Sequence, residues 1–524
     1  MMRKFFLLLQ TVKYLKAKQI IYQVWYNIKP KKTLSHYKKI GVSFSPLQFS
    51  INYFSAKQYK GNLTFEFLNR EYQFQTNIDW NLQQNGKLWN YNLQYFYFLQ
   101  QEDISNAQKQ YWLKDIAGWL YARKLPLEPY PVSLRAINIM RYLSFYQSRE
   151  EFIVESLYAQ LNYLYHNFEF HLLGNHLLEN AFALLMGAEV FNKKRWKSKA
   201  KKILLEELKE QILDDGGHFE QSVMYHQIIT FRILELADWY KKTKNADVVF
   251  LKFIEATAIK MLDWLKTISF KNGDMPLLND SANGITFTSN ELFSFAGILK
   301  LPEQKFISLK DSGYRKYCND DYECIIDAGG IAASYQPGHS HADALSFVLQ
   351  HKNIPVITDV GVSTYEADEA RNYERSTAVH NTVTINHANQ SEMWGSFRIG
   401  KRAKVKIINE TASSLEAFHN GYTQYNAIHK RAFSFNESSI KIVDVIESEK
   451  KLPAKSLLHF HPDCFVKQEK NIVTVNDIIF SFEGIENIQL DSYKFASGFN
   501  KRIDGKVVII EFYHSLKTII NFNK

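Results

Sequence analysis

Apolar residues recur at intervals of three and four from about residue 85 to residue 305. This spacing places them on one face of a helix. It is clear in the runs SLRAINIMRYLSFY, HLLENAFALLMGAEVF and QIITFRILELADWYKKT. Short breaks that contain Gly, Asn, Asp or Pro separate the runs, so the pattern predicts eight to ten helices. No repeat period is evident in the sequence.

The period of the pattern changes near residue 310. Short β-branched segments with alternating apolar positions follow, among them YECIIDAGGIAASY, SIKIVDVIE and VVIIEFYH. Turns separate them at about ten-residue spacing, which is typical of an antiparallel sandwich. We therefore predict a multidomain α+β chain. It has an arm at residues 1–60, a helical domain at 61–310 and a β-sandwich at 311–524.

Composition and charge narrow the function classes. The 524 residues are 46% apolar, 23% charged and 15% aromatic, as in globular proteins. The formal net charge is +10, but residues 1–60 hold twelve Lys or Arg and no acidic residue. The remaining chain is close to neutral and carries no nucleic-acid-binding motif, so we expect no nucleic-acid partner. The aromatic side chains could stack on sugars or simply fill cores.

The first 30 residues form a basic and partly apolar segment. The apolar run at Phe5–Leu9 is short for a signal peptide, and no small-residue cleavage site follows it. Phe5, Leu8, Val12 and Leu15 have helical spacing, with lysines between them. Such a helix can lie on an anionic membrane surface, or it can dock on the protein's own body. No segment approaches the apolar length of a transmembrane helix.

The stretch GHSHADALSF at residues 338–347 places two histidines one residue apart. In a strand, the side chains of His339 and His341 would project from the same face. Asp359 and His380 belong to two further predicted strands. Two histidines and a carboxylate suit a divalent metal of the zinc type, although isolated His and Asp residues can equally be satisfied by hydrogen bonds.

The helical half contributes a second polar cluster. Asn175, His176 and Glu179 lie within little more than one turn of a helix that is otherwise apolar. Asn175 could simply cap the helix, with Glu179 on its exposed side. Tyr225 follows a Gly-Gly turn and adjoins a strongly apolar helix. A tyrosine near a cation can exchange protons, but an isolated one would be a packing residue.

Tyrosines and arginines fill the segment between Asp359 and His380. Tyr365 and Arg371 are among them. An arginine here could bind a carboxylate in a bidentate manner, or it could pair with the neighbouring acidic residues on the surface.

Taken together, these stretches resemble the heparinase II/III family of polysaccharide lyases, which is related to alginate lyases of the same architecture. The resemblance covers roughly residues 85–400. It rests, in order along the chain, on LWNYNLQYF, YPVSLRAINIMR, GNHLLENAFAL, DGGHFEQSVMYH, PLLNDS, GHSHADALSF and RSTAVHNTV. It implies an incomplete (α/α) toroid followed by an antiparallel β-sandwich, in agreement with the change of period.

The resemblance also implies a reaction, which is β-elimination on an anionic, uronic-acid-containing polysaccharide. A base removes the proton on carbon 5, and the bond to the oxygen on carbon 4 then breaks. Neutralising the carboxylate stabilises the enolate that develops when this proton leaves. By resemblance, Asn175 and His176 neutralise the carboxylate, while Tyr225 and His339 exchange protons. Glu179, Tyr365 and Arg371 contact the substrate, and a structural zinc is held by His341, Asp359 and His380.

Three alternatives stay open. A uronate carbon-5 epimerase uses the same proton abstraction, a hydrolase would use acidic residues such as Asp214, Asp215 and Glu220, and a non-catalytic protein would only bind or assemble polysaccharide. The basic arm and its continuation YNIKPKKTL resemble family members associated with bacterial surface-polysaccharide synthesis. That favours the periplasm or attachment to the inner membrane, with a cytoplasmic location also open.

Overall fold

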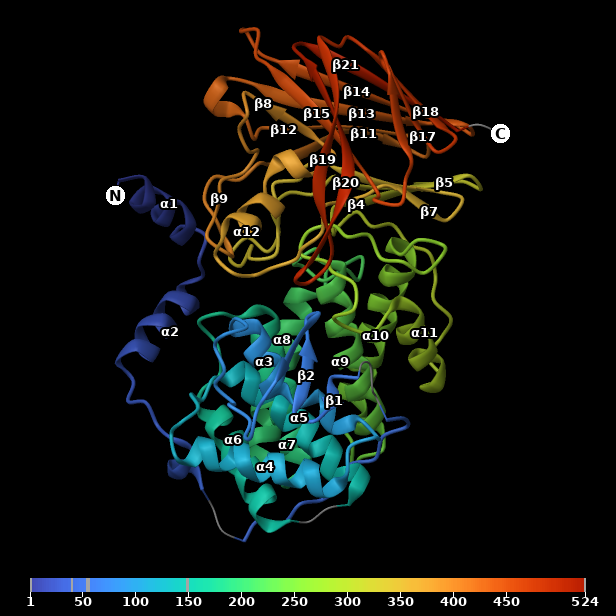
Figure 1. Cartoon of the computed structure of the whole chain (residues 1–524). Coiled ribbons are helices and arrows are strands. Elements are labelled where there is room, and N and C mark those ends of the chain that lie inside the picture. The colour runs from blue at the N-terminus through green and yellow to red at the C-terminus, as the bar shows by residue number, and fades with distance from the viewer. Residues whose placement is uncertain (1, 39–40, 53–56, 148–149, 523–524) are drawn as a thin grey trace.

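The computed structural model describes residues 2–38, 41–52, 57–147 and 150–522, without the side chains of residues 2–5. A helical domain leads into a sheet-rich domain (Figure 1). Nine helices lie between residues 87 and 298 of the described chain, which confirms the predicted helical half. They are α3 (Lys87–Tyr95), α4 (Asn106–Tyr121), α5 (Pro129–Tyr146), α6 (Glu151–His166), α7 (Gly174–Val190), α8 (Lys194–Gln211), α9 (Val223–Lys241), α10 (Val248–Ile268) and α11 (Ser289–Ile298).

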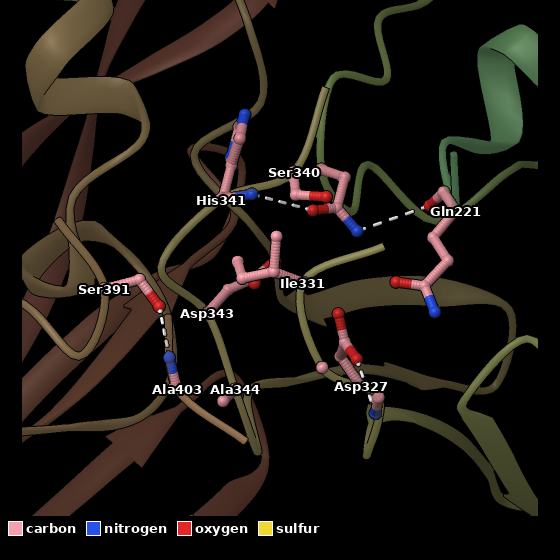
Figure 2. Close-up of a pocket in the computed structure, with 12 residues that line it drawn as sticks. Gln221, Asp327, Ile331, Ser340, His341, Asp343, Ala344, Ser391 and Ala403 are labelled. Carbon is pink, nitrogen blue, oxygen red and sulfur yellow. Dashed lines mark hydrogen bonds between the residues drawn. The ribbon is translucent and has the colours of Figure 1, made fainter. Parts of the chain in front are cut away.

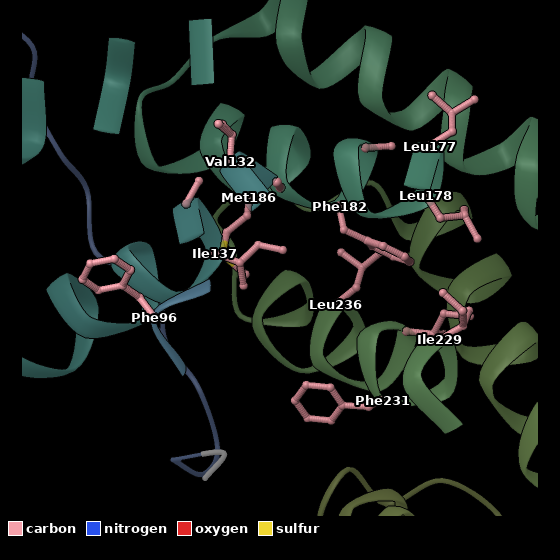
Figure 3. Close-up of a cluster of buried hydrophobic side chains, with 14 of the residues drawn as sticks. Phe96, Val132, Ile137, Leu177, Leu178, Phe182, Met186, Ile229, Phe231 and Leu236 are labelled. Carbon is pink, nitrogen blue, oxygen red and sulfur yellow. The ribbon is translucent and has the colours of Figure 1, made fainter. Parts of the chain in front are cut away.

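Helices α5, α7 and α9 form the centre of the helical domain. Nearly every residue of α7 is buried, so this helix is enclosed on all sides. Figure 3 shows Ile137 of α5, Phe182 and Met186 of α7, and Leu236 of α9 meeting in one apolar cluster. The beginnings of α7 and α9, which carry the predicted polar residues, are therefore held by a closely packed interior.

The sheet-rich domain is a sandwich of two antiparallel sheets. One has the strand order β11-β12-β13-β14-β21-β18-β17-β16. Its strands are β11 (Val405–Thr411), β12 (Ser414–His419), β13 (Ile428–Phe435), β14 (Ser439–Glu447), β16 (Val466–Glu469), β17 (Ile472–Val475), β18 (Ile478–Glu483) and β21 (Ser515–Phe522).

The other sheet has the order β19-β20-β15-β7-β6-β5-β4, and β8 also pairs with β15. Its strands are β4 (Tyr314–Cys318), β5 (Tyr322–Asp327), β6 (Phe347–His351), β7 (Ile354–Ile357), β8 (Val383–Ile385), β15 (Ala454–Phe460), β19 (Asn487–Gly498) and β20 (Lys501–Phe512). Two small sheets complete the described strands: β1 (Tyr59–Gly61), β2 (Thr64–Phe67) and β3 (Arg70–Gln73) in one, and β9 (Met393–Trp394) and β10 (Arg398–Ile399) in the other.

The second sheet joins the two domains. Along β5, Ile325 belongs to the apolar core that the helices share, whereas its neighbours Cys324 and Ile326 belong to the core between the sheets. Strand alternation thus lets one sheet contribute to two cores. The long β19–β20 hairpin reaches down to the helical domain (Figure 1). There the Asn69 side chain donates to the carbonyl of Phe499 at 3.0 Å.

Two short helices form the arm, α1 (Met2–Val12) and α2 (Ala17–Ile28). They lie along one side of the molecule, α1 beside the sandwich and α2 beside the helical domain (Figure 1). The carbonyl of Ile399 in β10 accepts a hydrogen bond from Thr11 at 3.3 Å. The carbonyl of Phe168 accepts one from Tyr26. Among the described residues, no helix is long and apolar enough to cross a membrane.

Candidate functional site

The segment that carries His339 and His341 is a loop, so the prediction of a strand at residues 338–347 is wrong. The strand β6 begins only at Phe347. The loop backbone bonds to tertiary partners instead of a ladder. The N–H of His341 donates to Asn279 Oδ1 at 3.0 Å, and the carbonyl of His339 accepts from the N–H of Asp280 at 3.1 Å. These contacts replace the strand pairing that the local pattern predicts.

Asp280 connects the two histidines. Its Oδ2 lies 2.8 Å from His339 Nδ1, and its Oδ1 lies 2.8 Å from His341 Nε2. Arg371 donates from Nη1 to Oδ1, and from Nη2 to Oδ2 at 2.6 Å. Burial alone would raise the pKa of Asp280. The charge of Arg371 and the hydrogen bonds from both histidines reverse that effect, so the pKa lies well below its usual value.

Tyr225 lies against His339 at the beginning of α9. The two ring centroids are 3.9 Å apart, with the planes inclined by 30°. Ser222 caps α9 by accepting a hydrogen bond from the N–H of Tyr225 at 3.2 Å, which fixes this first turn. The hydroxyl of Tyr225 lies 3.3 Å from that of Tyr365. Burial raises the pKa values of both phenols well above 10, so both rings carry their protons at neutral pH.

Asn175 and His176 occupy the first turn of α7. The residue that precedes this helix as its cap is Leu173, so Asn175 does not serve as the cap. His176 Nδ1 lies 3.2 Å from Glu169 Oε1, and the His176 ring stacks on Tyr130 at 4.2 Å. Burial lowers the pKa of His176, but the charge and hydrogen bond of Glu169, together with the charges of Glu220 and Glu179, outweigh it, and the net pKa is raised.

Two residues that we expected to contact substrate are enclosed. Glu179 is fully buried in the helical domain, where Arg232 Nε lies 3.0 Å from its Oε2. Arg371, in α12 (Glu369–Glu374), is also fully buried, and its guanidinium is occupied by Asp280. Neither expectation of direct contact fits this structure, and Glu179 does not lie on an exposed helix face. A buried charge requires a buried partner, and both residues have one.

The predicted metal ligands do converge. His341, Asp359 and His380 each offer a ligand atom, and these atoms lie within 4.8 Å of one another. The prediction that Asp359 and His380 belong to strands is wrong, because Asp359 follows the end of β7 and His380 follows the short helix η3 (Thr377–Val379). Within the described chain, His341 Nδ1 and His380 Nε2 are buried and have no hydrogen-bond partner. Such orphaned nitrogens beside a carboxylate fit a cation of the zinc type.

A small pocket adjoins this cluster. Figure 2 shows Ser340, His341 and Asp343 along one side of it, with Gln221 and Asp327 on the other. Burial raises the pKa of Asp343 to about 6. Burial and the charge of Asp343 also raise the pKa of Asp327 well above its usual value. The region around the three ligands is therefore dry, and charged groups there lose much of their hydration.

Sequence reasoning missed two acidic groups of this site. Asp280 lies in the stretch PLLNDS, where an acidic residue after an apolar run was the available signal. From the sequence, Glu220 was a candidate only for the acid of a hydrolase. Its Oε2 lies 3.7 Å from His339 Nε2, and neither of its carboxylate oxygens has a hydrogen-bond partner among the described residues. Burial raises the pKa of Glu220, although His339 and His176 act in the opposite direction.

Comparison with known protein families shows to which family the chain belongs. Residues 131–301 match the family described as Heparinase II/III N-terminus, and residues 302–522 match Heparinase II/III-like, C-terminal. The chain belongs to the heparinase II/III family. The boundary between the two matched regions lies just before β4, where the helical half ends and the sandwich begins.

Curated relatives of the chain are longer proteins. A heparin-sulfate lyase of Pedobacter heparinus is 26% identical over an alignment of 321 residues, and the match covers 53% of this chain and 48% of the relative. One from Bacteroides stercoris is 26% identical over an alignment of 265 residues, and the match covers 43% of this chain and 38% of that protein. The aligned part thus spans about half of the first relative's length or less.

Solved structures show that the fold is shared across more than nine-tenths of the chain. A crystal structure of heparinase III superimposes with a TM-score of 0.71 at 16% identity, covering 94% of this chain and 89% of that one. A crystal structure of a heparan sulfate lyase HepC mutant from Pedobacter heparinus superimposes with a TM-score of 0.60 at 18% identity. The match covers 91% of this chain and 86% of that one. The fold is accordingly an incomplete (α/α) toroid followed by an antiparallel β-sandwich, as the sequence predicts.

Loss of a ligand should abolish metal retention. We expect purified protein to hold stoichiometric zinc, measured by elemental mass spectrometry, and His380→Ala to lose it because two ligands rarely retain zinc. His514→Ala, which changes an exposed histidine, is the control. Equal zinc in both variants, or none in the wild type, would show that the cluster is not a zinc site.

Asp280→Asn should destabilise the protein strongly. The amide keeps the shape of the carboxylate but leaves the buried Arg371 without its counter-charge, which costs about 3–5 kcal/mol of unfolding free energy. Urea denaturation of the full chain measures the change. Asp463→Asn alters a side chain that is 88% exposed and should have little effect. A midpoint for Asp280→Asn equal to that of the control would contradict the central role of this carboxylate.

Proposed function

We propose that the protein is a polysaccharide lyase that cleaves a uronic-acid-containing polymer by β-elimination. The observation that carries the proposal is the arrangement of His339. Its Nδ1 is held by Asp280, its ring is stacked by Tyr225, and it belongs to a loop of the sandwich domain while Tyr225 belongs to the toroid. Family membership and the names of the relatives support this reaction class.

His339 is suited to remove the proton on carbon 5. The ionised Asp280 accepts a hydrogen bond from Nδ1–H, which leaves the lone pair on Nε2. A carboxylate that orients an imidazole in this way fixes its tautomer and stabilises the imidazolium that forms. The base is therefore prepared before substrate arrives.

Tyr225 is suited to protonate the oxygen that leaves carbon 4. Burial holds its phenol in the neutral form, which is the form of an acid. The neighbouring hydroxyl of Tyr365, at 3.3 Å, can hydrogen-bond to the phenolate that remains after donation. The acid for the oxygen on carbon 4 and the base for the proton on carbon 5 then lie side by side, as elimination across the bond between these two carbons requires.

Asn175 and His176 are suited to neutralise the substrate carboxylate. The raised pKa of His176 favours a cation, and a cation stabilises the enolate that develops when carbon 5 loses its proton. Glu169 and Tyr130 fix the position of the imidazole. Glu179 and Arg371, which are buried, act in this proposal only by supporting the residues around them.

The charges around His339 favour a weakly charged polymer. Glu220 and Asp280 border the imidazole, and the guanidinium of Arg371 is already neutralised by Asp280. A densely sulfated chain would need cations that are free to pair with it. We therefore propose a uronate polymer of low sulfation as the substrate.

A bound divalent cation would act structurally in this scheme. His341, Asp359 and His380 come from three separate segments, and a cation would tie them together beside the loop that carries His339. The positioning of His339 by Asp280 does not depend on the cation.

Ultraviolet absorbance of an unsaturated uronate product tests the reaction. We expect a rise with at least one polymer among alginate, hyaluronan, chondroitin, glucuronan and heparan sulfate. Tyr225→Phe and His339→Ala should each lower the rate by about a hundredfold or more, because each loses a proton-transfer group.

Tyr111→Phe, in which the tyrosine is 54% exposed on α4, is the matched control and should keep full activity. A flat trace on every polymer from folded, metal-loaded protein would remove the lyase proposal. Incorporation of solvent deuterium without any absorbance change would indicate the epimerase instead.

The activity should depend on pH through His176. The pKa of this group is raised, so the cation is present at low pH and is lost as pH rises through that pKa. Glu169→Gln removes the main charge that raises it. The alkaline limb of the pH profile of kcat/KM should then move to lower pH. The control, Glu303→Gln, changes an exposed residue and should leave this limb in place. An unmoved limb in Glu169→Gln would refute the carboxylate-neutralising role of His176.

A further inference from the structure

The outer face of the arm exposes an unusual number of large apolar side chains. Nine of them lie within α1 and α2, and Ile21 and Ile28 are 64% and 69% exposed. Along α2 they recur at helical spacing and form one stripe. The full set is Phe6, Leu8, Leu9, Val12, Ile20, Ile21, Val24, Trp25 and Ile28. An exposed apolar patch of this kind marks an interaction site.

The inner face of the same helices is already in contact with the protein's own body. Gln19 donates to the carbonyl of Leu172 at 3.4 Å, and the ring of Tyr22 packs on Phe170 at 4.8 Å. On α1, the indole of Trp394 donates to Thr11 at 3.1 Å. Docking on the body therefore accounts for one face of each helix and leaves the apolar stripe unexplained.

The positive charge of the arm indicates an anionic partner. Residues 1–60 hold twelve Lys or Arg and no acidic residue, while the rest of the chain is close to neutral. Lys13, Lys18, Lys31 and Lys32 of the arm are exposed. Apolar side chains bordered by lysines, with a tryptophan among them, match the boundary between acyl chains and anionic headgroups.

We propose that α1 and α2 dock the protein peripherally on an anionic lipid bilayer. With 11 and 12 residues, each helix has little more than half the length that is needed to span one. Each can instead lie in the interface, with the stripe among the acyl chains and the lysines at the headgroups. A protein partner would be expected to offer acidic and basic groups of its own, and the arm has no acidic residue to meet a basic one.

Docking would hold the candidate site beside the membrane. Lys16 of the arm lies 4.0 Å above the ring of Tyr335, in the loop between β5 and β6. The next residue, Gln336, packs directly against Gly174, which precedes Asn175 and His176. The arm is thus connected to the beginning of α7 through two neighbouring residues. This consequence rests on the proposed function, whereas the docking itself does not.

Vesicle flotation of the full-length protein tests the docking. We expect the wild type to float with vesicles of phosphatidylcholine and phosphatidylglycerol, to bind weakly to phosphatidylcholine alone, and to be released by high salt. Val24→Glu should weaken the partition by about tenfold or more, since it places a charge among the acyl chains. Val249→Glu makes the same change at a valine that is 80% exposed on α10, and should float like the wild type.

The outcomes separate docking from its rivals. Thermal melting of Val24→Glu at the wild-type temperature shows that the variant is folded, and unchanged ultraviolet activity on a soluble polymer shows that its site is intact. No flotation by the wild type, or equal flotation by Val24→Glu, would overturn the proposal. A dimer in light scattering that Val24→Glu disperses, without vesicle binding, would identify a second copy of the chain as the occupant and would also overturn it.

Discussion

The carboxylate of Asp280 is the point on which the candidate site depends. It lies between α10 and α11 of the helical half and binds three groups of the sandwich domain, namely His339, His341 and Arg371. A carboxylate that is fully buried is stable only when charge and hydrogen bonds compensate for its lost hydration. Here the compensation comes entirely from across the domain boundary. The same interaction therefore joins the domains, orients the candidate base and positions a predicted metal ligand.

The junction makes chemistry possible that neither domain offers alone. The toroid supplies Tyr225 and His176, each in the first turn of a helix whose remainder is packed in a dense core. The sandwich supplies His339 and Tyr365 from loops. Loops carry reactive groups well only when something rigid holds them, and here both loops rest on the toroid. The β19–β20 hairpin and the arm add further contacts across the same boundary.

Burial also decides which protonation states the site offers. It keeps the phenol of Tyr225 neutral and lowers the pKa of His176, but Glu169, with the charges of Glu220 and Glu179, raises the pKa of His176 again. An acid and a cation thus arise from one dry environment because nearby negative charges favour the neutral form of a phenol and the protonated form of an imidazole. Charges this close act strongly, since little water remains to screen them.

The sequence by itself determined the two-domain architecture and most of the candidate reactive residues, but not Asp280 or the place of Glu220 beside His339. Apolar periodicity is a local property, so it predicted the helices between residues 87 and 298 and the strands after residue 310. The strand pattern and the family resemblance also brought out His341, Asp359 and His380, whose ligand atoms the fold brings within 4.8 Å of one another. The tertiary structure alone decided that residues 338–346 form a loop, that Asp280 holds it, and that Glu179 and Arg371 are buried. These outcomes depend on pairings such as that between Asp280 and Arg371, 91 positions apart, and no local pattern specifies a partner at that distance.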